Sequence, residues 1–157
     1  MKFSTREDIE APIEFVYKAI TDFDAFERAA MRRGADVERT AGQTAKGVGT
    51  SWIVAFEFRG KPRELKGALV EADAPNRLRF EGTLSGLDVA LDVDLVALSK
   101  KRTRLHVATE LKPRSLSARL LIQSLRLAKT SLTKRFKSRI AEFAEDLEDR
   151  HRRGVSA

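Results

Sequence analysis

The chain has 157 residues, a formal net charge of +7 and 42% hydrophobic residues, which fits one globular domain with a core of its own. It contains no cysteine and 2 histidines, so disulfides, thiolate metal sites and a multi-histidine metal site are excluded. We therefore expect no metal and no cofactor. Because the N-terminus is charged and no apolar run reaches the length of a membrane span, we expect a cytoplasmic protein.

The N-terminal part of the chain predicts a strand followed by two short helices. Residues 2–11 alternate between two faces, the pattern of a half-buried strand. Pro12 ends this strand and suits the first turn of a helix. Asp22 or Asp24 can cap a second short helix, which Gly34 ends. A short strand near 36–40 and a glycine-containing hairpin loop at 42–49 follow. The loop lacks the Gly-Lys-Ser/Thr sequence of a phosphate-binding loop.

Strands dominate the middle of the chain, near residues 50–59, 63–72, 77–84, 87–98 and 103–112. In the strand at 87–98 the odd positions are all apolar, and the even positions carry Asp88, Asp92 and Asp94. Such alternation predicts an antiparallel sheet that buries one face. Across the following turn, these aspartates can face Arg104 and His106.

The segment from Pro113 to Arg150 predicts one long amphipathic helix, roughly 50 Å long at about 1.5 Å per residue. Ser115 or Ser117 can cap its start, and no proline or glycine follows until Gly154. Its apolar stripe consists of Leu121, Leu125, Ala128, Leu132, Phe136, Ile140, Phe143 and Leu147. A stripe of this length needs a large apolar surface to cover, and the sheet is the surface that this chain offers.

Together these elements predict a single α+β domain at residues 1–150. A curved antiparallel sheet of about seven strands packs around the long C-terminal helix, and the two short helices fill one end. Residues 151–157 are expected to form a disordered tail.

Four short stretches, followed by the long final helix, occur in an order typical of one superfamily. They are residues 9–16 (IEAPIEFV), 20–22 (ITD), 47–50 (GVGT) and 70–78 (VEADAPNRL). In these features nearly the whole chain resembles the START-like superfamily, also called SRPBCC, of polyketide cyclases, lipid-transfer domains and birch-allergen-type proteins. The resemblance implies a helix-grip fold with an apolar cavity between sheet and helix, but no particular reaction. The chain departs from it in having Phe23 and Phe26 where a tryptophan is often found.

The apolar faces that meet in the interior predict a ligand cavity. Its expected lining is Trp52, Phe56, Leu91, Val93, Val107, Thr109, Leu125 and Leu132. With the resemblance, this lining favours a protein that binds a small apolar molecule, such as a lipid, over an enzyme. The hydroxyl of Thr109 can contact a ligand or bond to the backbone.

Glu7 is the most unusual residue on the predicted inner face. It shares that face with Phe3 and Ile9, and a carboxylate in an apolar interior is costly unless it is paired. Glu7 is therefore a candidate ligand contact. It is also the candidate acid or base of the alternative function, an enzyme of the cyclase or dehydratase kind. A bulge that turns Glu7 outward, or a salt bridge, is the structural alternative.

Residues 111–141 contain no acidic residue and many cations. We do not expect nucleic-acid binding, because these cations flank the buried stripe on both sides and no aromatic residue is interleaved on an exposed face. Leu116, Leu120 and Leu127 lie opposite that stripe, rimmed by basic residues. They predict an interaction surface, either for a second copy of the chain or for an anionic membrane. The alternative is that the helix starts later or bends, so that these leucines cover the cavity mouth.

Overall fold

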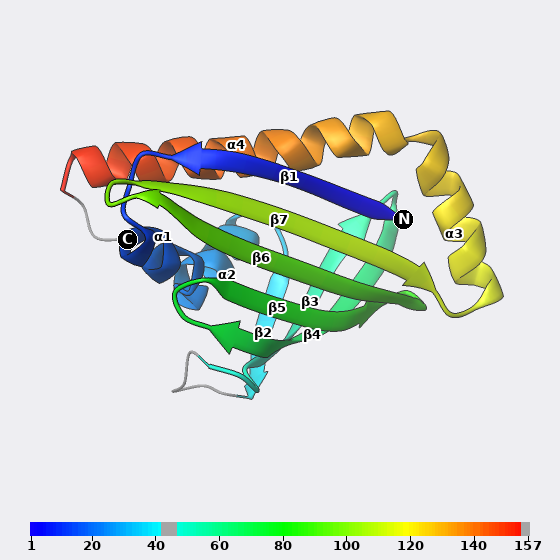
Figure 1. Cartoon of the computed structure of the whole chain (residues 1–157). Coiled ribbons are helices and arrows are strands. Elements are labelled where there is room, and N and C mark those ends of the chain that lie inside the picture. The colour runs from blue at the N-terminus through cyan, green and yellow to red at the C-terminus, as the bar shows by residue number, and fades with distance from the viewer. Residues whose placement is uncertain (42–46, 155–157) are drawn as a thin grey trace.

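The computed structural model describes residues 1–41 and 47–154 (Figure 1). Residues 42–46 of the loop expected at 42–49 and residues 155–157 of the expected tail lie outside the described part of the chain. The strands are β1 (Lys2–Ile9), β2 (Asp36–Ala41), β3 (Ser51–Phe58), β4 (Lys61–Asp73), β5 (Arg77–Leu84), β6 (Leu87–Ser99) and β7 (Arg102–Pro113). The helices are α1 (Ile13–Ile20), α2 (Phe23–Arg32), α3 (Leu116–Leu127) and α4 (Lys129–Arg152).

The strands form one curved antiparallel sheet in the order β1-β7-β6-β5-β4-β3-β2. The predicted strands are all present, with limits within about two residues of those expected. The predicted parity of β6 is also confirmed, since Leu87, Val93 and Leu95 are buried. The alternation of apolar and polar residues therefore selects the face of the sheet that packs against the helices.

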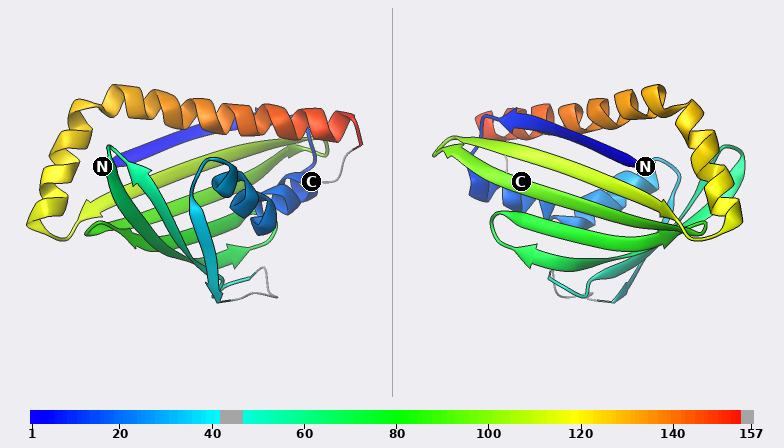
Figure 2. Two further views of the ribbon diagram at one scale, coloured as in Figure 1. Left: turned by 180° about the vertical axis from the view of Figure 1, so that it is seen from behind. Right: turned by 45° about the vertical axis from the view of Figure 1, so that its right-hand side comes forward.

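The short helices begin and end where the sequence predicts. Helix α1 follows Pro12, and the Asp22 carboxylate caps α2 by accepting a hydrogen bond of 3.2 Å from the Ala25 N–H. Gly34, with φ 94°, follows the end of α2 in a conformation that favours glycine. Both helices lie at one end of the sheet (Figure 2).

The C-terminal helix bends, so the prediction of one continuous helix from 113 to 150 is wrong. Helices α3 and α4 meet at Ala128, where the N–H donates 3.0 Å to the carbonyl of Leu125, three residues back. This tighter turn changes the direction of the chain. Helix α4 runs beside β1, whereas α3 turns across the end of the sheet opposite α1 and α2 (Figures 1 and 2). One straight helix cannot cover both surfaces.

Two apolar clusters fill the interior. The larger one joins α1, α2 and the C-terminal half of α4 to the sheet, and it includes the fully buried Ile9, Leu78 and Leu147. The smaller one lies under α3 and consists of Leu87, Ala118, Ile122 and Leu125. Because burial of one large aliphatic side chain is worth about 1.5–3 kcal/mol, these clusters hold the helices on the sheet.

Helix α4 continues to Arg152, beyond the expected domain limit at residue 150. The ring of His151 packs 4.8 Å, between centroids, from the ring of Phe15 on α1. The first residues of the expected tail are thus helical. Among residues 1–41 and 47–154, no helix combines the length and the apolar character needed to cross a membrane.

Candidate ligand cavity

An apolar cavity of about 300 Å³ lies between the inner face of the sheet and the bent C-terminal helix, toward the α3 end. Its polar lining residues are Arg63, Ser85 and Thr109. The apolar lining residues are Phe3, Phe56, Phe58, Leu84, Leu87, Leu111, Leu121, Leu125, Leu132 and Phe136. Such a lining, with few polar groups, is typical of sites that bind small molecules.

The predicted lining residues divide between the cavity and the core. Phe56, Thr109, Leu125 and Leu132 line the cavity. Val93 and Val107 belong to the larger apolar cluster, and Trp52 and Leu91 pack against it. All eight lie on the expected inner faces, but α1 and α2 fill one end of the interior. The open space is left at the other end.

Trp52 is held as part of the core. Its indole N–H donates 2.7 Å to a carboxylate oxygen of Glu27 on α2. Its ring lies edge-on to Phe23, 5.2 Å between centroids, and 6.1 Å from Phe80. The same Glu27 carboxylate accepts 2.7 Å from Arg39 Nε, so α2, β2 and β3 are joined at this point.

Glu7 lies outside the cavity lining. It is half-buried on β1, opposite Leu105 of β7, and β1 contributes Phe3 to the cavity instead. Within the described residues, the Glu7 carboxylate has no hydrogen bond or ion pair. The candidate acid or base therefore stands apart from the space in which a ligand would react.

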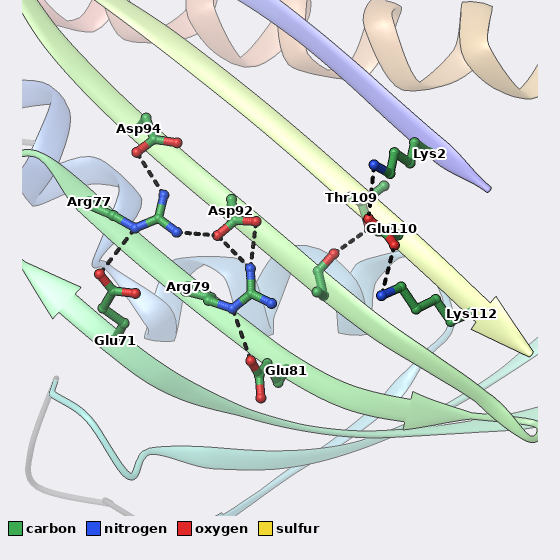
Figure 3. Close-up of polar contacts among 11 residues, drawn as sticks. Lys2, Glu71, Arg77, Arg79, Glu81, Asp92, Asp94, Thr109, Glu110 and Lys112 are labelled. Carbon is green, nitrogen blue, oxygen red and sulfur yellow. Dashed lines mark hydrogen bonds and ion pairs between the residues drawn. The ribbon is translucent and has the colours of Figure 1, made fainter. Parts of the chain in front are cut away.

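The hydroxyl of Thr109 is used by the backbone. Its Oγ1 donates 2.9 Å to the carbonyl oxygen of Ala90 on the neighbouring strand β6 (Figure 3). Its hydroxyl proton is therefore committed to the sheet, although the residue lines the cavity. Arg63 and Ser85 are therefore the lining residues with side-chain donors available to a ligand, whereas Thr109 Oγ1 can still accept a hydrogen bond.

Sequence reasoning missed Arg63 and Ser85, although a signal for Arg63 was present. On β4, Arg63 lies on the same face as Leu65, Gly67 and Leu69. The same alternation rule singled out Glu7 on β1. Ser85 carried no such signal. It lies in the two-residue turn between β5 and β6, with φ 49°, and the neighbouring Gly86 has φ 78°. Positive φ at both positions is typical of a tight hairpin turn.

Arg63 lies at the boundary between two hollows. The apolar cavity adjoins a second hollow, and the two share Arg63, Ser85 and Leu121 in their linings. The second hollow is also lined by Lys61 at the start of β4 and by Ser117 and Leu120 on α3. The two hollows therefore meet at Arg63, on the side of the cavity next to α3.

The outer face of the sheet carries a network of ion pairs (Figure 3). Arg77 contacts Glu71, Asp92 and Asp94, and Arg79 contacts Glu81 and Asp92. The hydrogen bond that Arg77 donates to the carboxylate of Asp94 raises the pKa of the Arg77 guanidinium. Within the described chain, the aspartates of β6 therefore pair mainly with arginines of β5, although Asp94 lies opposite His106 in the register of β6 and β7. These charges are satisfied among themselves and support the sheet.

Comparison with solved structures shows the fold. The chain aligns with the Zhui aromatase/cyclase from Streptomyces sp. R1128 at a TM-score of 0.70 and 12% identity, covering 100% of this chain and 99% of the other. Norcoclaurine synthase from Thalictrum flavum, solved as a point mutant with a transition-state analogue, aligns at a TM-score of 0.68 and 15% identity. The alignment covers 97% of this chain and 96% of the other. A START superfamily protein from Mycobacterium smegmatis aligns at a TM-score of 0.55 and 15% identity, covering 85% of this chain and 95% of the other.

No protein-family model matches the chain, and no curated protein sequence is significantly similar to it. The structural matches establish that the chain has the START-like helix-grip fold, as the resemblance in its sequence predicted. Proteins with this fold include enzymes, so the fold alone selects neither catalysis nor binding.

Proposed function

We propose that this protein binds a small, mainly apolar molecule in the cavity beneath α3. The observation that carries the proposal is the cavity itself, about 300 Å³ in volume with three polar residues in its lining. This volume is at the lower end of the range of about 300–1,000 Å³ seen for ligand pockets. A ligand with a short apolar chain would be sheltered from water by α3 and α4.

A binding function is favoured over the cyclase- or dehydratase-type alternative. That enzyme needs an acid or base inside the cavity, and Glu7 is not among the lining residues. Arg63, Ser85 and Thr109 are the polar lining residues, and the hydroxyl of Thr109 already donates to Ala90. No acid–base pair of the lining supports proton transfer.

Octanol is a suitable first probe, because it is small, uncharged and mainly apolar. We expect isothermal titration calorimetry to detect one octanol bound per chain. The variant Leu125→Trp places a larger side chain in the cavity and should abolish this binding, since Leu125 lines the cavity and is buried. Native mass spectrometry of the protein from its own host would detect a retained natural ligand.

Leu127→Trp is the matched control, because Leu127 lies on the same helix but is 92% exposed. It should bind octanol as the unmodified protein does. Thermal melting followed by circular dichroism would establish that both variants are folded. Absence of octanol binding to the unmodified protein, or equal binding by the Leu125→Trp variant, would count against the proposed function.

A further inference from the structure

We infer that Arg63 recognises an oxyanion at the head of the bound molecule, so that the ligand is an amphiphile with a carboxylate or phosphate group. This inference rests on the proposed function and specifies its ligand class. The Nε of the Arg63 guanidinium is buried and has no hydrogen-bond partner within the described residues. Buried polar groups normally have partners, so this one needs an explanation.

The charge of Arg63 is also unpaired within residues 1–41 and 47–154. Among the described residues, its hydrogen bond runs from Nη1 to the Ser85 Oγ, at 3.3 Å, and this oxygen is neutral. Arg150 provides a contrast. Its Nε also lacks a partner, but its guanidinium forms an ion pair of 3.0 Å with Asp146. Arg63 therefore differs from Arg150, because no carboxylate of the described residues compensates its charge.

The position of Arg63 fits an amphiphile. Opposite Phe56 in the β3–β4 register, it lies where the apolar cavity meets the second hollow. An apolar chain can occupy the cavity between Leu125 and Leu132 while an oxyanion stays beside Arg63 at the mouth. A guanidinium offers two parallel N–H donors to a carboxylate or phosphate, and such charge-assisted bonds are stronger than neutral ones. The hydroxyl of Ser85 adds a further donor at the same place.

Three probes with the same alkyl chain test this inference: octanol, octanoate and octyl phosphate. We expect the unmodified protein to bind the two anions more tightly than octanol, by on the order of tenfold. Arg63→Met keeps much of the apolar stem but removes the charge. It should abolish the preference for the anions, so that octanoate and octyl phosphate bind no more tightly than octanol. The difference between octanoate and octyl phosphate identifies the preferred head group.

Lys66→Met is the matched control, because Lys66 lies on the same strand and its exposed side chain points to the other face. It makes the same change in net charge and should retain the preference for anions. Equal binding of octanol and octanoate by the unmodified protein would overturn the role of Arg63 but leave the proposed function intact. Equal losses in the Lys66→Met and Arg63→Met variants would also overturn it. Binding of none of the probes would contradict the proposed function itself.

Separate observations, on the outward side of α3, lead us to propose that this helix docks on an anionic membrane surface. Leu116, Leu120 and Leu127 remain 76%, 58% and 92% exposed after the bend at Ala128, although Leu120 also lines the second hollow. Exposed apolar residues gathered on one helix typically mark a contact surface. The opposite side of α3 carries Leu121 and Leu125, which line the cavity.

The charges around these leucines favour an anionic partner. Arg119 and Arg126 lie beside them and are exposed, and no ion pair is formed by either within the described residues. The β3–β4 turn brings Arg59 to the same place, because its Nη1 donates 2.6 Å to the Ser124 Oγ on α3. An apolar row with basic flanks is suited to the surface of anionic lipid.

A second copy of the chain fits this surface less well. A twofold contact places the same patch on both sides of the interface, so the arginines of one copy would approach those of the other. Residues 111–141 contain no acidic residue that could compensate them. A membrane that contains anionic lipid supplies the missing negative charge.

Sedimentation with vesicles of phosphatidylcholine, with and without phosphatidylserine, tests the docking of α3. We expect binding only when phosphatidylserine is present, weakened by salt, and reduced at least tenfold by Leu120→Glu together with Leu127→Glu. The matched control is Val96→Glu with Leu98→Glu, because these exposed apolar residues lie near the turn between β6 and β7, far from α3. This control should bind vesicles normally.

Light scattering after size-exclusion chromatography separates membrane docking from self-association. The proposal predicts the same molar mass for the unmodified protein and for the variant with two glutamates on α3. A dimer that this variant dissociates would assign the surface to a second copy and overturn the proposal. Absence of vesicle binding by the unmodified protein would overturn it as well.

Discussion

At the scale of single residues, neighbouring carboxylates on β1 have different environments. Glu7 is half-buried and unpaired within the described chain, whereas Asp8 accepts hydrogen bonds from Arg104 Nε and Nη2 at 2.8 and 3.2 Å. Parity along a strand predicts which side chain points inward. It does not predict whether a ligand cavity lies at that level of the strand. The same rule applied to β4 would have identified Arg63.

The pairing of Asp8 leads to a prediction on pH dependence. The hydrogen bond from Arg104 lowers the pKa of Asp8 below its ordinary value of 3.8. Because the folded-state pKa is the lower one, the stabilisation by Asp8 is present above 3.8 and is lost as pH falls through the folded-state pKa. Carbon-detected NMR titration should show this lowered pKa in the unmodified protein and a value nearer the ordinary one in Arg104→Gln. An unchanged pKa in that variant would refute the assignment to Arg104.

At the scale of elements, hydrophobic periodicity predicted the strands but not the bend between α3 and α4. No proline or glycine lies near the bend at Ala128, and the apolar stripe continues on the same side of the helix from Leu125 to Leu132. A continuous phase is compatible with a straight helix and with a bent one. The choice depends on a surface that periodicity does not describe, because α3 covers the end of the sheet and α4 covers β1.

The close approach of β4 and β5 gives a prediction with an internal control. Gly67 and Gly82 lie directly opposite each other in the β4–β5 register. A Cβ atom on Gly82 would collide with the backbone carbonyl oxygen of Lys66, whereas the nearest atom to a Cβ on Gly67 would be 3.7 Å away. We expect Gly82→Ala to lower the free energy of unfolding by about 1–3 kcal/mol, the usual effect of overpacking. Gly67→Ala should be tolerated far better.

Chemical denaturation of both variants measures this difference. Equal stability of the Gly82→Ala and Gly67→Ala variants would contradict the close approach of β4 to Gly82 of β5. The comparison bears on the cavity, because β4 carries Arg63 and β5 leads into the turn that carries Ser85. A shift between these strands would separate the two polar groups at the cavity mouth.

At the scale of the whole molecule, the sequence predicted the layers of the fold better than the place of the cavity. Alternation identified the inner faces of the strands, and the resemblance supplied their helix-grip arrangement. Neither states how far α1 and α2 reach into the interior. Because these helices pack on Val93 and Val107 but leave Leu125 and Leu132 beside open space, the cavity lies at the α3 end. That position depends on contacts between elements distant in the sequence.

The most direct test of the central claim is an NMR experiment that locates a bound amphiphile. In an isotope-filtered spectrum of methyl-labelled protein with unlabelled octanoate, the chain protons should show nuclear Overhauser effects to methyl groups of Leu121, Leu125 and Leu132, which line the cavity. The fully buried Leu147, in the filled end of the interior, should show none. Contacts confined to the exposed Leu116, Leu120 and Leu127, or no contacts at all, would contradict a ligand site between the sheet and the bent helix.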